Sequence, residues 1–229
     1  MIEISTSSRW RRGFPGAHIG ILLIGNVDNT KRLTPLDELK KEVVSSLRSN
    51  YAGCSRAELL ELEVLQAYKS YYKKFDKTYH LQLQLESILH KGKSLPNVNP
   101  LVDANFAAEM DSLLLTAGHD ADCLCSPVTI DVSSGMEKYI LMNGSEKALK
   151  ANDMMMTDSK GVVCTIIYGQ DQRTLISPKT RRALYVTYAP FGVEEAAVTA
   201  HMDIIKKNVL LFAPDAEVEY MQVHTADMG

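Results

Sequence analysis

The sequence is poor in cysteine and in long apolar runs, and both shortages narrow the class of protein. Its longest apolar stretches, such as residues 19–24 and 209–212, are far shorter than the roughly 20 residues of a membrane-spanning helix. No charged segment followed by an apolar run opens the chain. The cysteines have no disulfide-framework spacing: Cys54, Cys123, Cys125 and Cys164. These features predict a cytoplasmic protein that makes no contact with a membrane.

The sequence also lacks a large excess of charge of either sign. Its 25 Lys and Arg residues face 28 Asp and Glu residues, which gives a formal net charge of -3. Such a chain does not coat nucleic acid by bulk charge, so DNA binding is not expected and any RNA contact must be local. With 45% hydrophobic residues, the chain can bury one sizeable core, and we expect a single domain over residues 1–229.

Common catalytic and cofactor motifs are missing as well. There is no glycine-rich phosphate loop, no G-x-S-x-G nucleophile elbow and no H-E-x-x-H pair. His119, Cys123 and Cys125 fall short of the four ligands of a structural zinc site. We therefore expect neither a metal nor a cofactor.

Hydrophobic periodicity divides the chain into a helix-rich half, residues 1–125, and a β-rich half, residues 126–229. After a buried strand within residues 14–26, helices are predicted over 34–50, from 55 toward 72, over 80–90 and from 100 to 118. Strands are predicted at 128–132, 139–142, 162–168 and 183–188, followed by a helix over 194–209 and a loose tail from residue 219. The expected fold class is α/β (α+β), with mixed β-sheet layers flanked by helices.

The segment from Ser94 to Leu124 is the first candidate for a functional site. Asn99 followed by Pro100 predicts a helix start, because the Asn side chain can accept from an early backbone N–H. Asp103 and Asn105 then lie in the first two turns, beside the apolar face that must be buried. Polar groups there must find partners or line a cavity. The pattern leaves a structural role and a ligand-binding role open.

A second candidate segment, residues 67–93, is locally basic. Its six lysines and two acids give a local charge of +4, and four tyrosines and a phenylalanine are placed among them. Lysines neutralise phosphates and aromatic rings stack on unpaired bases, so the mixture fits an RNA-contacting surface. It equally fits a helix with lysines on its solvated face and tyrosines half-buried.

Several motifs, in this order, resemble one known family. They are YYKKF at 71–75, KGKSLPNVNPLVDANF at 91–106, GHDAD at 118–122, YGQDQRT at 168–174 and TRRALYV at 180–186, which leads into Ala189-Pro190. Together they resemble the B-three/B-four type tRNA-binding and editing domain of the phenylalanyl-tRNA synthetase β subunit, in its free-standing bacterial form. The resemblance extends from about Phe14 to Pro214.

The resemblance implies an α/β fold with a pocket between sheet and helices, where misattached tyrosine is removed from tRNA. Asn105 matches an Asn of that pocket wall. Two positions depart from the family pattern: Ala117 stands where the family has a histidine, and Val186 or Thr187 stands where it has a glutamate. Because the residues lining a site decide which side chain it accepts, these departures change the expected amino-acid specificity.

The first hypothesis is therefore a trans-acting deacylase whose partner is a mischarged aminoacyl-tRNA. In it, Asn99, Asp103, Asn105 and Thr187 shape the substrate pocket, and His119 or Asp120 holds the attacking water. Arg173 meets the phosphate or carbonyl of the acceptor end. The tRNA backbone is bound by Lys69, Lys73, Lys74 and Lys77.

Two alternatives remain open at this stage. The first is a non-catalytic module that binds a free amino acid or a tRNA acceptor end in the same pocket. The second is an internal ion-pair network of Asp103, Asp120, Asp122 and Arg173 that binds no ligand, since buried carboxylates beside an arginine are often structural. The oligomeric state cannot be predicted from the sequence.

Overall fold

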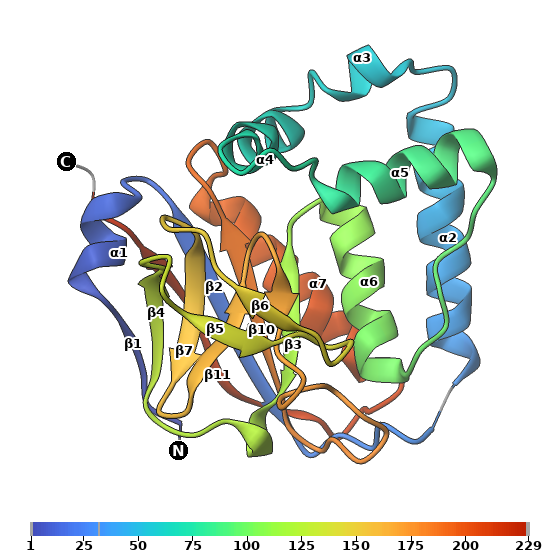
Figure 1. Ribbon diagram of the computed structural model, residues 1–229. Helices are drawn as coiled ribbons and strands as arrows, with labels where there is room; N and C mark the ends of the chain where they lie inside the picture. Colours follow the sequence, from blue (N-terminus) through green and yellow to red (C-terminus); the bar gives the residue numbers. More distant parts are fainter. Residues whose placement is uncertain (1, 32, 228–229) are drawn as a thin grey trace.

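Two β-sheets packed face to face, with helices covering one of them, make up the fold (Figure 1). The computed structural model describes residues 2–31 and 33–227. One sheet is antiparallel, with strand order β11 (Glu217–Thr225), β2 (His18–Gly25), β10 (Ala183–Ala189) and β3 (Thr116–Asp120). The other has the order β1 (Ile4–Thr6), β4 (Val128–Val132), β7 (Met154–Asp158), β8 (Gly161–Thr165) and β9 (Gly169–Gln170).

In the second sheet β1 runs parallel to β4, and the remaining neighbours are antiparallel. A separate hairpin joins β5 (Lys138–Ile140) and β6 (Glu146–Ala148). The helices are α1 (Ser8–Gly13), α2 (Thr34–Asn50), α3 (Arg56–Leu59), α4 (Glu63–Lys73), α5 (His80–Lys91), α6 (Pro100–Ser112) and α7 (Glu195–Leu210), with a short 3₁₀ turn η1 (Ala121–Cys123). The α/β class expected from the sequence is thus confirmed.

Strand β2 lies inside the molecule and is buried on both faces, which explains its nearly continuous apolar sequence. Ile19 and Ile21 face the second sheet, whereas Leu22 and Ile24 face α6 and α7. Gly20 allows this close packing, since a Cβ there would lie 2.7 Å from Cγ1 of Val198 on α7. Burial on both faces places β2 at the centre of the three layers.

Helix α6 is also buried on almost every side, between α7, α2, α5 and β3. It begins as predicted: the Asn99 side chain accepts from Val102 N at 3.2 Å and Pro100 occupies the first turn. It does not extend to Gly118. It ends at Ser112, and Leu113 takes a left-handed conformation with φ of 60°. Residues 116–120 instead pair with β10 as strand β3, because backbone pairing there outweighs the helical spacing of the apolar residues.

Two further sequence predictions fail in detail. The helix expected from 55 toward 72 is split, since α3 ends at Leu59 and α4 begins at Glu63, although the predicted capping box of Ser55 and Glu58 is present. The tail expected to be loose from Glu219 belongs to β11, which pairs along the whole of β2. None of the helices in the described ranges combines the length and apolarity that a membrane span requires. A single domain over residues 1–229 stays a prediction.

Candidate functional site

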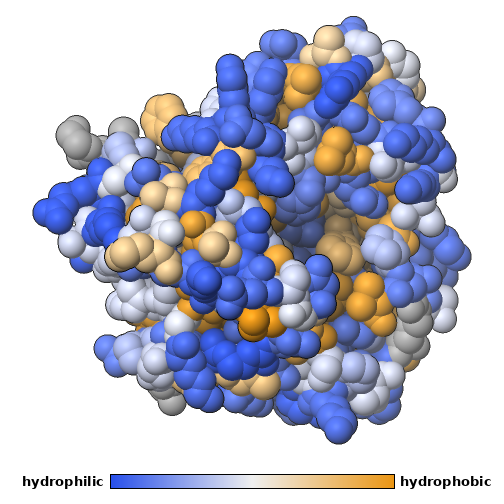
Figure 2. Space-filling model, in the orientation of Figure 1, coloured by the Kyte–Doolittle hydropathy of each residue, from blue (hydrophilic) through white to orange (hydrophobic). Residues whose placement is uncertain are grey.

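A two-lobed hollow, here called the central cleft, opens between α5, α6 and the ends of the strands (Figure 2). The first lobe, of about 270 Å³, reaches between the two sheets to Ala117 and Tyr188. The second, of about 230 Å³, is lined by apolar side chains that include those of Leu81, Leu95, Pro96 and Met110. His80, Phe106 and Glu109 line both lobes. The two lobes therefore form one continuous site around these three residues.

Glu109 is a buried carboxyl group on the cleft wall, only 3% exposed. Its Oε1 accepts from Thr116 N at 2.8 Å, while Asn105, one turn earlier on α6, donates from Nδ2 to Thr116 O at 3.1 Å. Strand β3 is the edge strand of its sheet and pairs with β10 on one side only. The two side chains thus hydrogen-bond to the N–H and the C=O of Thr116 on its other side. This pair of contacts fixes α6 to the start of β3 and orients Glu109.

Burial raises the pKa of Glu109 to about 8, and the hydrogen bond from Thr116 N offsets only part of that effect. At neutral pH the group is therefore mostly an uncharged carboxylic acid. Since Oε1 accepts from the backbone, Oε2 is the oxygen that can carry the proton and donate it to a ligand. A neutral carboxyl group in a cleft is a hydrogen-bond donor of the kind that polarises a carbonyl.

His80, the first residue of α5, is exposed to solvent and lines both lobes together with Glu109. Its Nδ1 lies 3.2 Å from the hydroxyl oxygen of Tyr72, and that hydroxyl donates its single proton to Ile166 O at 3.0 Å. Tyr72 must then accept from Nδ1–H, which leaves the Nε2 lone pair of His80 for another proton. Desolvation lowers the pKa of His80 below 6.5, so the imidazole is neutral at physiological pH.

Two buried polar atoms near the cleft have no nitrogen or oxygen hydrogen-bond partner among the residues described. One is Oδ1 of Asn105, and the other is the hydroxyl of Tyr188, which lines the first lobe, is 1% exposed and interacts with the Cys164 thiol. Buried polar groups are nearly always paired with protein, water or ligand. The cleft is thus a polar site with capacity for further hydrogen bonds, although its second lobe is apolar.

The residues predicted for the substrate pocket are divided between the cleft and its support. Ala117 lines the first lobe, and Asn105 lies directly behind the wall formed by Phe106 and Glu109. Asn99 caps α6 and also accepts from Asn29 Nδ2 at 3.0 Å. Asp103 is 1% exposed and pairs with Lys40 on α2 at 2.8 Å, away from the cleft.

Thr187 and the two residues predicted to hold water do not line the cleft, and of the three only Asp120 is half-buried and not fully buried. Thr187 is buried toward the helices, with its hydroxyl 2.9 Å from that of Thr116. His119 is fully buried in β3, where Nδ1 meets Thr174 Oγ1 at 2.8 Å, and burial lowers its pKa to about 3. Asp120 accepts from Thr180 Oγ1 at 2.6 Å. The first three residues of the GHDAD motif at 118–122 belong to strand β3.

Arg173 forms an ion pair with Asp158 at 2.8 Å and with Asp171 at 3.2 Å. Asp122 pairs instead with Arg182 at 2.7 Å. The four groups considered as one ion-pair network therefore belong to separate contacts, and the hypothesis of a single network among them is wrong. Each of these groups is nevertheless held by protein atoms.

The aromatic residues of the basic segment are core residues. Tyr68 and Tyr79 are fully buried and stack with ring centroids 4.1 Å apart, and Tyr71, Tyr72 and Phe75 are each 3% exposed. The stacking of RNA bases on these rings is thereby contradicted. The lysines predicted to bind tRNA, in contrast, are exposed: Lys69, Lys73, Lys74 and Lys77.

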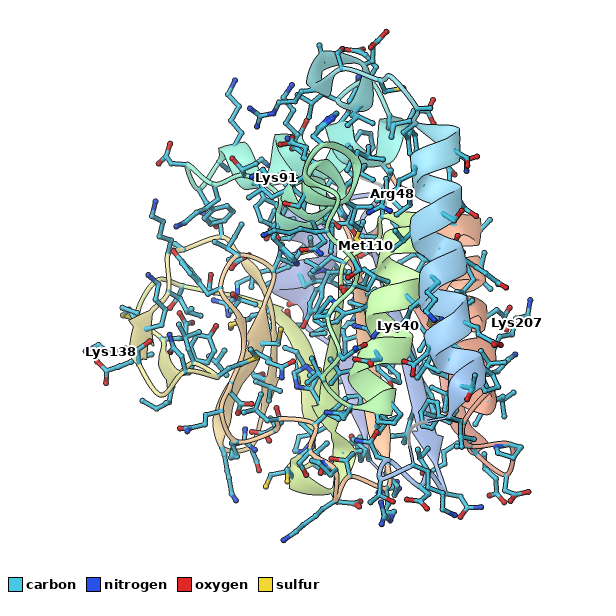
Figure 3. The ribbon with its side chains drawn as sticks, turned by 90° about the vertical axis from the view of Figure 1, so that its right-hand side faces the viewer. Lys40, Arg48, Lys91, Met110, Lys138 and Lys207 are labelled. Carbon is cyan, nitrogen blue, oxygen red and sulfur yellow. The ribbon has the colours of Figure 1, made fainter. Side chains whose placement is uncertain are left out.

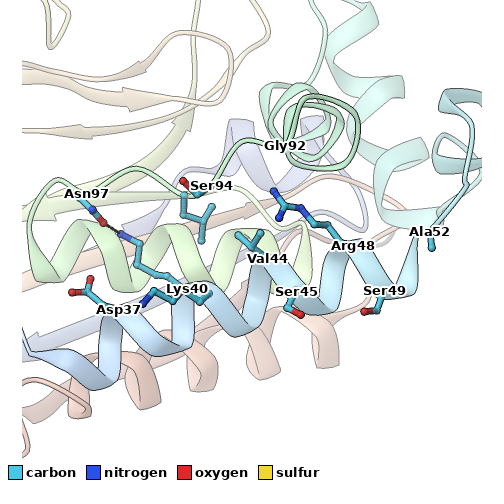
Figure 4. A pocket seen from close by; sticks show the side chains of 12 residues that line it. Asp37, Lys40, Val44, Ser45, Arg48, Ser49, Ala52, Gly92, Ser94 and Asn97 are labelled. Atoms are coloured by element: carbon cyan, nitrogen blue, oxygen red, sulfur yellow. Dashed lines mark hydrogen bonds between the residues drawn. The ribbon is translucent and has the colours of Figure 1, made fainter.

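A groove with a volume of about 770 Å³ runs along α2 beside residues 92–97 (Figures 3 and 4). Two of its main cationic groups are engaged by the protein. The Lys40 amine contacts Asp103, Pro96 O and Asn97, and Arg48 donates to the carbonyl oxygens of Ile88 and Lys93. These contacts bind the segment 92–97 to α2, so the groove is better explained as a structural seam than as a ligand site.

Over residues 2–31 and 33–227, no group of three or more His, Cys, Asp or Glu side chains is placed to hold a metal ion. Sequence reasoning missed two groups that line both lobes of the cleft, His80 and Glu109. Glu109 had one available signal: it is an acid within the small and apolar run FAAEM. His80 had none, because its role depends on Tyr72 and Ile166, which are brought together only by folding.

Comparisons with known proteins give a match to a family model and matches to solved structures. A family model described as the B3/4 domain matches residues 64–200. A search of curated proteins finds no match. Among solved structures, an N-terminal fragment of the phenylalanyl-tRNA synthetase β subunit from Pyrococcus horikoshii is similar with a TM-score of 0.49 and 8% identity. That match covers 97% of this chain and 54% of the other, so this chain spans about half the length of the fragment.

Proposed function

The chain belongs to the B3/4 domain family, and from that premise we propose that it hydrolyses the ester of a mischarged aminoacyl-tRNA in the central cleft. Family membership points to a role connected with tRNA. The observation that carries the finer proposal is that His80 and Glu109 line the same two lobes, a neutral base and a neutral acid in one cleft. A neutral imidazole can accept a proton, and a carboxyl group whose pKa is raised to about 8 can donate a hydrogen bond at neutral pH.

In the proposed reaction, Nε2 of His80 takes a proton from a water molecule as the water attacks the ester carbonyl carbon. The carbonyl oxygen becomes an oxyanion and accepts a hydrogen bond from Oε2–H of Glu109. The bond between the carbonyl carbon and the ribose oxygen then breaks, and the imidazolium returns its proton to that oxygen. The products are a free amino acid and a tRNA with its terminal hydroxyl restored.

The size of the cleft fits this substrate. Pockets for drug-sized ligands measure roughly 300–1,000 Å³, so a first lobe of about 270 Å³ suits a single aminoacyl group. Ala117, and either Val186 or Thr187, replace the histidine and the glutamate that the resemblance predicts. The proposal therefore names the reaction and does not name the amino acid that is removed. Removal of tyrosine in particular is not part of the proposal.

The residues first predicted for the site have supporting roles in this proposal. Asn105 holds Thr116 and thereby Glu109, and Asn99 and Asp103 fix the start of α6. His119, Asp120, Arg173 and Thr187 remain predictions as direct contacts of substrate. A cytoplasmic location and a free-standing, trans-acting form belong to the same proposal.

The test is the deacylation of a panel of mischarged tRNAs by the wild-type protein and by His80→Ala. Loss of a general base lowers turnover by about 10²–10⁴-fold. His90→Ala is the matched control, because His90 is exposed near the other end of the same helix and does not line the cleft. We expect turnover of at least one ester, a large loss in His80→Ala and no loss in His90→Ala.

The second candidate function is a non-catalytic module that binds an amino acid or an RNA end, favoured by the apolar lining of the second lobe. If no ester in the panel is cleaved faster than without protein, the catalytic proposal is wrong. Calorimetric binding of an amino acid or an acceptor-end RNA by the same sample would then support the module.

A further inference from the structure

Three of the four predicted RNA-binding lysines converge on one concavity, here called the basic pocket, between α3, α4 and α5. It has a volume of about 310 Å³, and its cationic lining comprises Arg56, Lys69, Lys73 and Lys77. Lys69 and Lys73 are four residues apart and so share one side of α4. Lys77 follows just beyond the end of that helix. The fold therefore separates these lysines from Lys74, which points elsewhere.

The three lysines of the basic pocket are uncompensated. Within the described ranges, no carboxylate lies within ion-pair distance of Lys69, Lys73 or Lys77. Arg56 is paired with Glu86 at 2.9 Å. The one acid on the pocket wall, Asp76, has a side chain that is 92% exposed and lies 3.7 Å from Lys150. A concave surface with three unpaired ammonium groups is a site for an anion.

The basic pocket and the central cleft lie on two sides of the same helical turn. Tyr79 and Gln82 line the basic pocket, whereas His80 and Leu81 line the cleft. The first turn of α5 contains no acid, and its N-cap residue Tyr79 makes no side-chain cap hydrogen bond. The partial positive charge at this helix end adds to the field of the lysines.

We propose that the basic pocket binds a backbone phosphate of the RNA strand whose 3′ end enters the central cleft. The proposal rests on the proposed function for the identity of that strand. A phosphodiester and a free phosphate present the same oxygen chemistry to the lysines, so inorganic phosphate is expected to compete for the pocket. The site positions the strand and carries no information on base sequence.

Lys74 supplies an internal control. It is exposed like the other three, but its ammonium lies 5.9 Å from the centroid of the Tyr71 ring, on the side of α4 away from the basic pocket. A uniform basic surface would use Lys73 and Lys74 equally. A discrete pocket would use Lys73 and not Lys74.

The experiment measures binding of a short single-stranded RNA that ends in CCA and has no amino acid attached. Fluorescence anisotropy follows the binding over a range of salt concentrations. Each phosphate neutralised contributes about 0.7 to the slope of log K against log salt for single strands. Because the basic pocket neutralises one phosphate, we expect the combined variant Lys69→Ala, Lys73→Ala, Lys77→Ala to lower the slope by about 0.7. Lys73→Ala should weaken RNA binding at low salt, and Lys74→Ala should leave it unchanged.

A second arm adds inorganic phosphate at constant ionic strength. Phosphate should weaken RNA binding by the wild type and leave residual binding by the combined variant unaffected. Because all these lysines are exposed, the variants should keep the denaturation midpoint of the wild type, which a urea denaturation curve checks.

The proposal is overturned if the wild type does not bind the RNA, if the combined variant keeps the wild-type slope, or if Lys74→Ala loses as much as Lys73→Ala. The RNA carries no ester, so the assay does not depend on catalysis. Specific loss of binding together with no ester turnover would refute the proposed function and support the phosphate site. Normal ester turnover by the wild type, together with an unchanged salt slope in the combined variant, would support the proposed function and refute the phosphate site.

Discussion

Asp103 and Glu109 lie six residues apart on α6, are both almost fully buried, and have opposite surroundings. Asp103 faces the seam with α2, where it pairs with Lys40 at 2.8 Å and accepts from Val98 N at 2.8 Å. Glu109 faces the central cleft, has no cation beside it in the described structure, and its pKa is raised to about 8. Asp103 therefore stabilises the fold through its ion pair, whereas Glu109 is an uncharged acid that adjoins a cavity.

This difference shows how burial alone is ambiguous as a sign of function. A buried carboxylate with a matching cation is a structural contact whose removal strands the partner. A buried carboxyl group without a cation beside it has a raised pKa, and such a group next to a cavity is typical of functional sites. The two residues are therefore expected to respond in opposite ways when they are changed.

The largest effect is expected from Asp103→Ala. It leaves the ammonium of Lys40 buried without its carboxylate, which destabilises proteins by about 3–5 kcal/mol. Urea denaturation at neutral pH measures the loss. Replacing both partners, Lys40→Met with Asp103→Leu, should recover most of it, since a packed apolar pair is often as stable as a buried ion pair. Surface ion pairs contribute less than about 1 kcal/mol. A loss of unfolding free energy in that range would mean that Asp103 does not differ from Glu109 in the way described.

A smaller effect, with a distinctive pH dependence, is expected from Glu109→Gln. The folded pKa of Glu109 is raised above its ordinary value of 4.5, so the folded protein keeps a proton that the unfolded chain has lost. The contribution of this group to stability is present at low pH and is lost as pH rises from about 4.5 to about 8. The slope is at most about 1.4 kcal/mol per pH unit.

Glutamine keeps the acceptor for Thr116 N and cannot ionise. Denaturation curves across this pH window should therefore show Glu109→Gln gaining stability relative to the wild type as the pH increases. A constant difference between the two proteins would mean that Glu109 is ionised in the folded state.

Much of the fold could be predicted from local pattern, because the signals concerned are local. The helix start at Asn99-Pro100, the helix over residues 34–50 and the strand over 128–132 depend on capping and on short-range periodicity, and all three are confirmed. The end of α6 and strands β3 and β11 depend on pairing with β10 and β2, which are distant in sequence. Strand pairing between segments that are distant in sequence produces no pattern in the neighbouring residues.

The site was predictable to a lesser extent. The sequence identified α6 as its main wall, since polar residues in an apolar helix must have partners, and it located Asn105 beside the cleft. It could not separate Asp103 from Glu109, because the difference lies in Lys40 on another helix. It also could not show that the tyrosines of residues 68–79 form a buried stack while the adjacent lysines stay exposed.

The pH dependence of aminoacyl-tRNA deacylation by the wild type and by Glu109→Gln tests the central claim most directly. With the enzyme-free rate subtracted, the wild-type rate should fall at acid pH as His80 is protonated and at alkaline pH near about 8 as Glu109 loses its proton. Glu109→Gln should keep the acid limb and lose the alkaline one, because its amide donor does not titrate. The same alkaline limb in both proteins would contradict the assignment of Glu109 as the donor in the cleft.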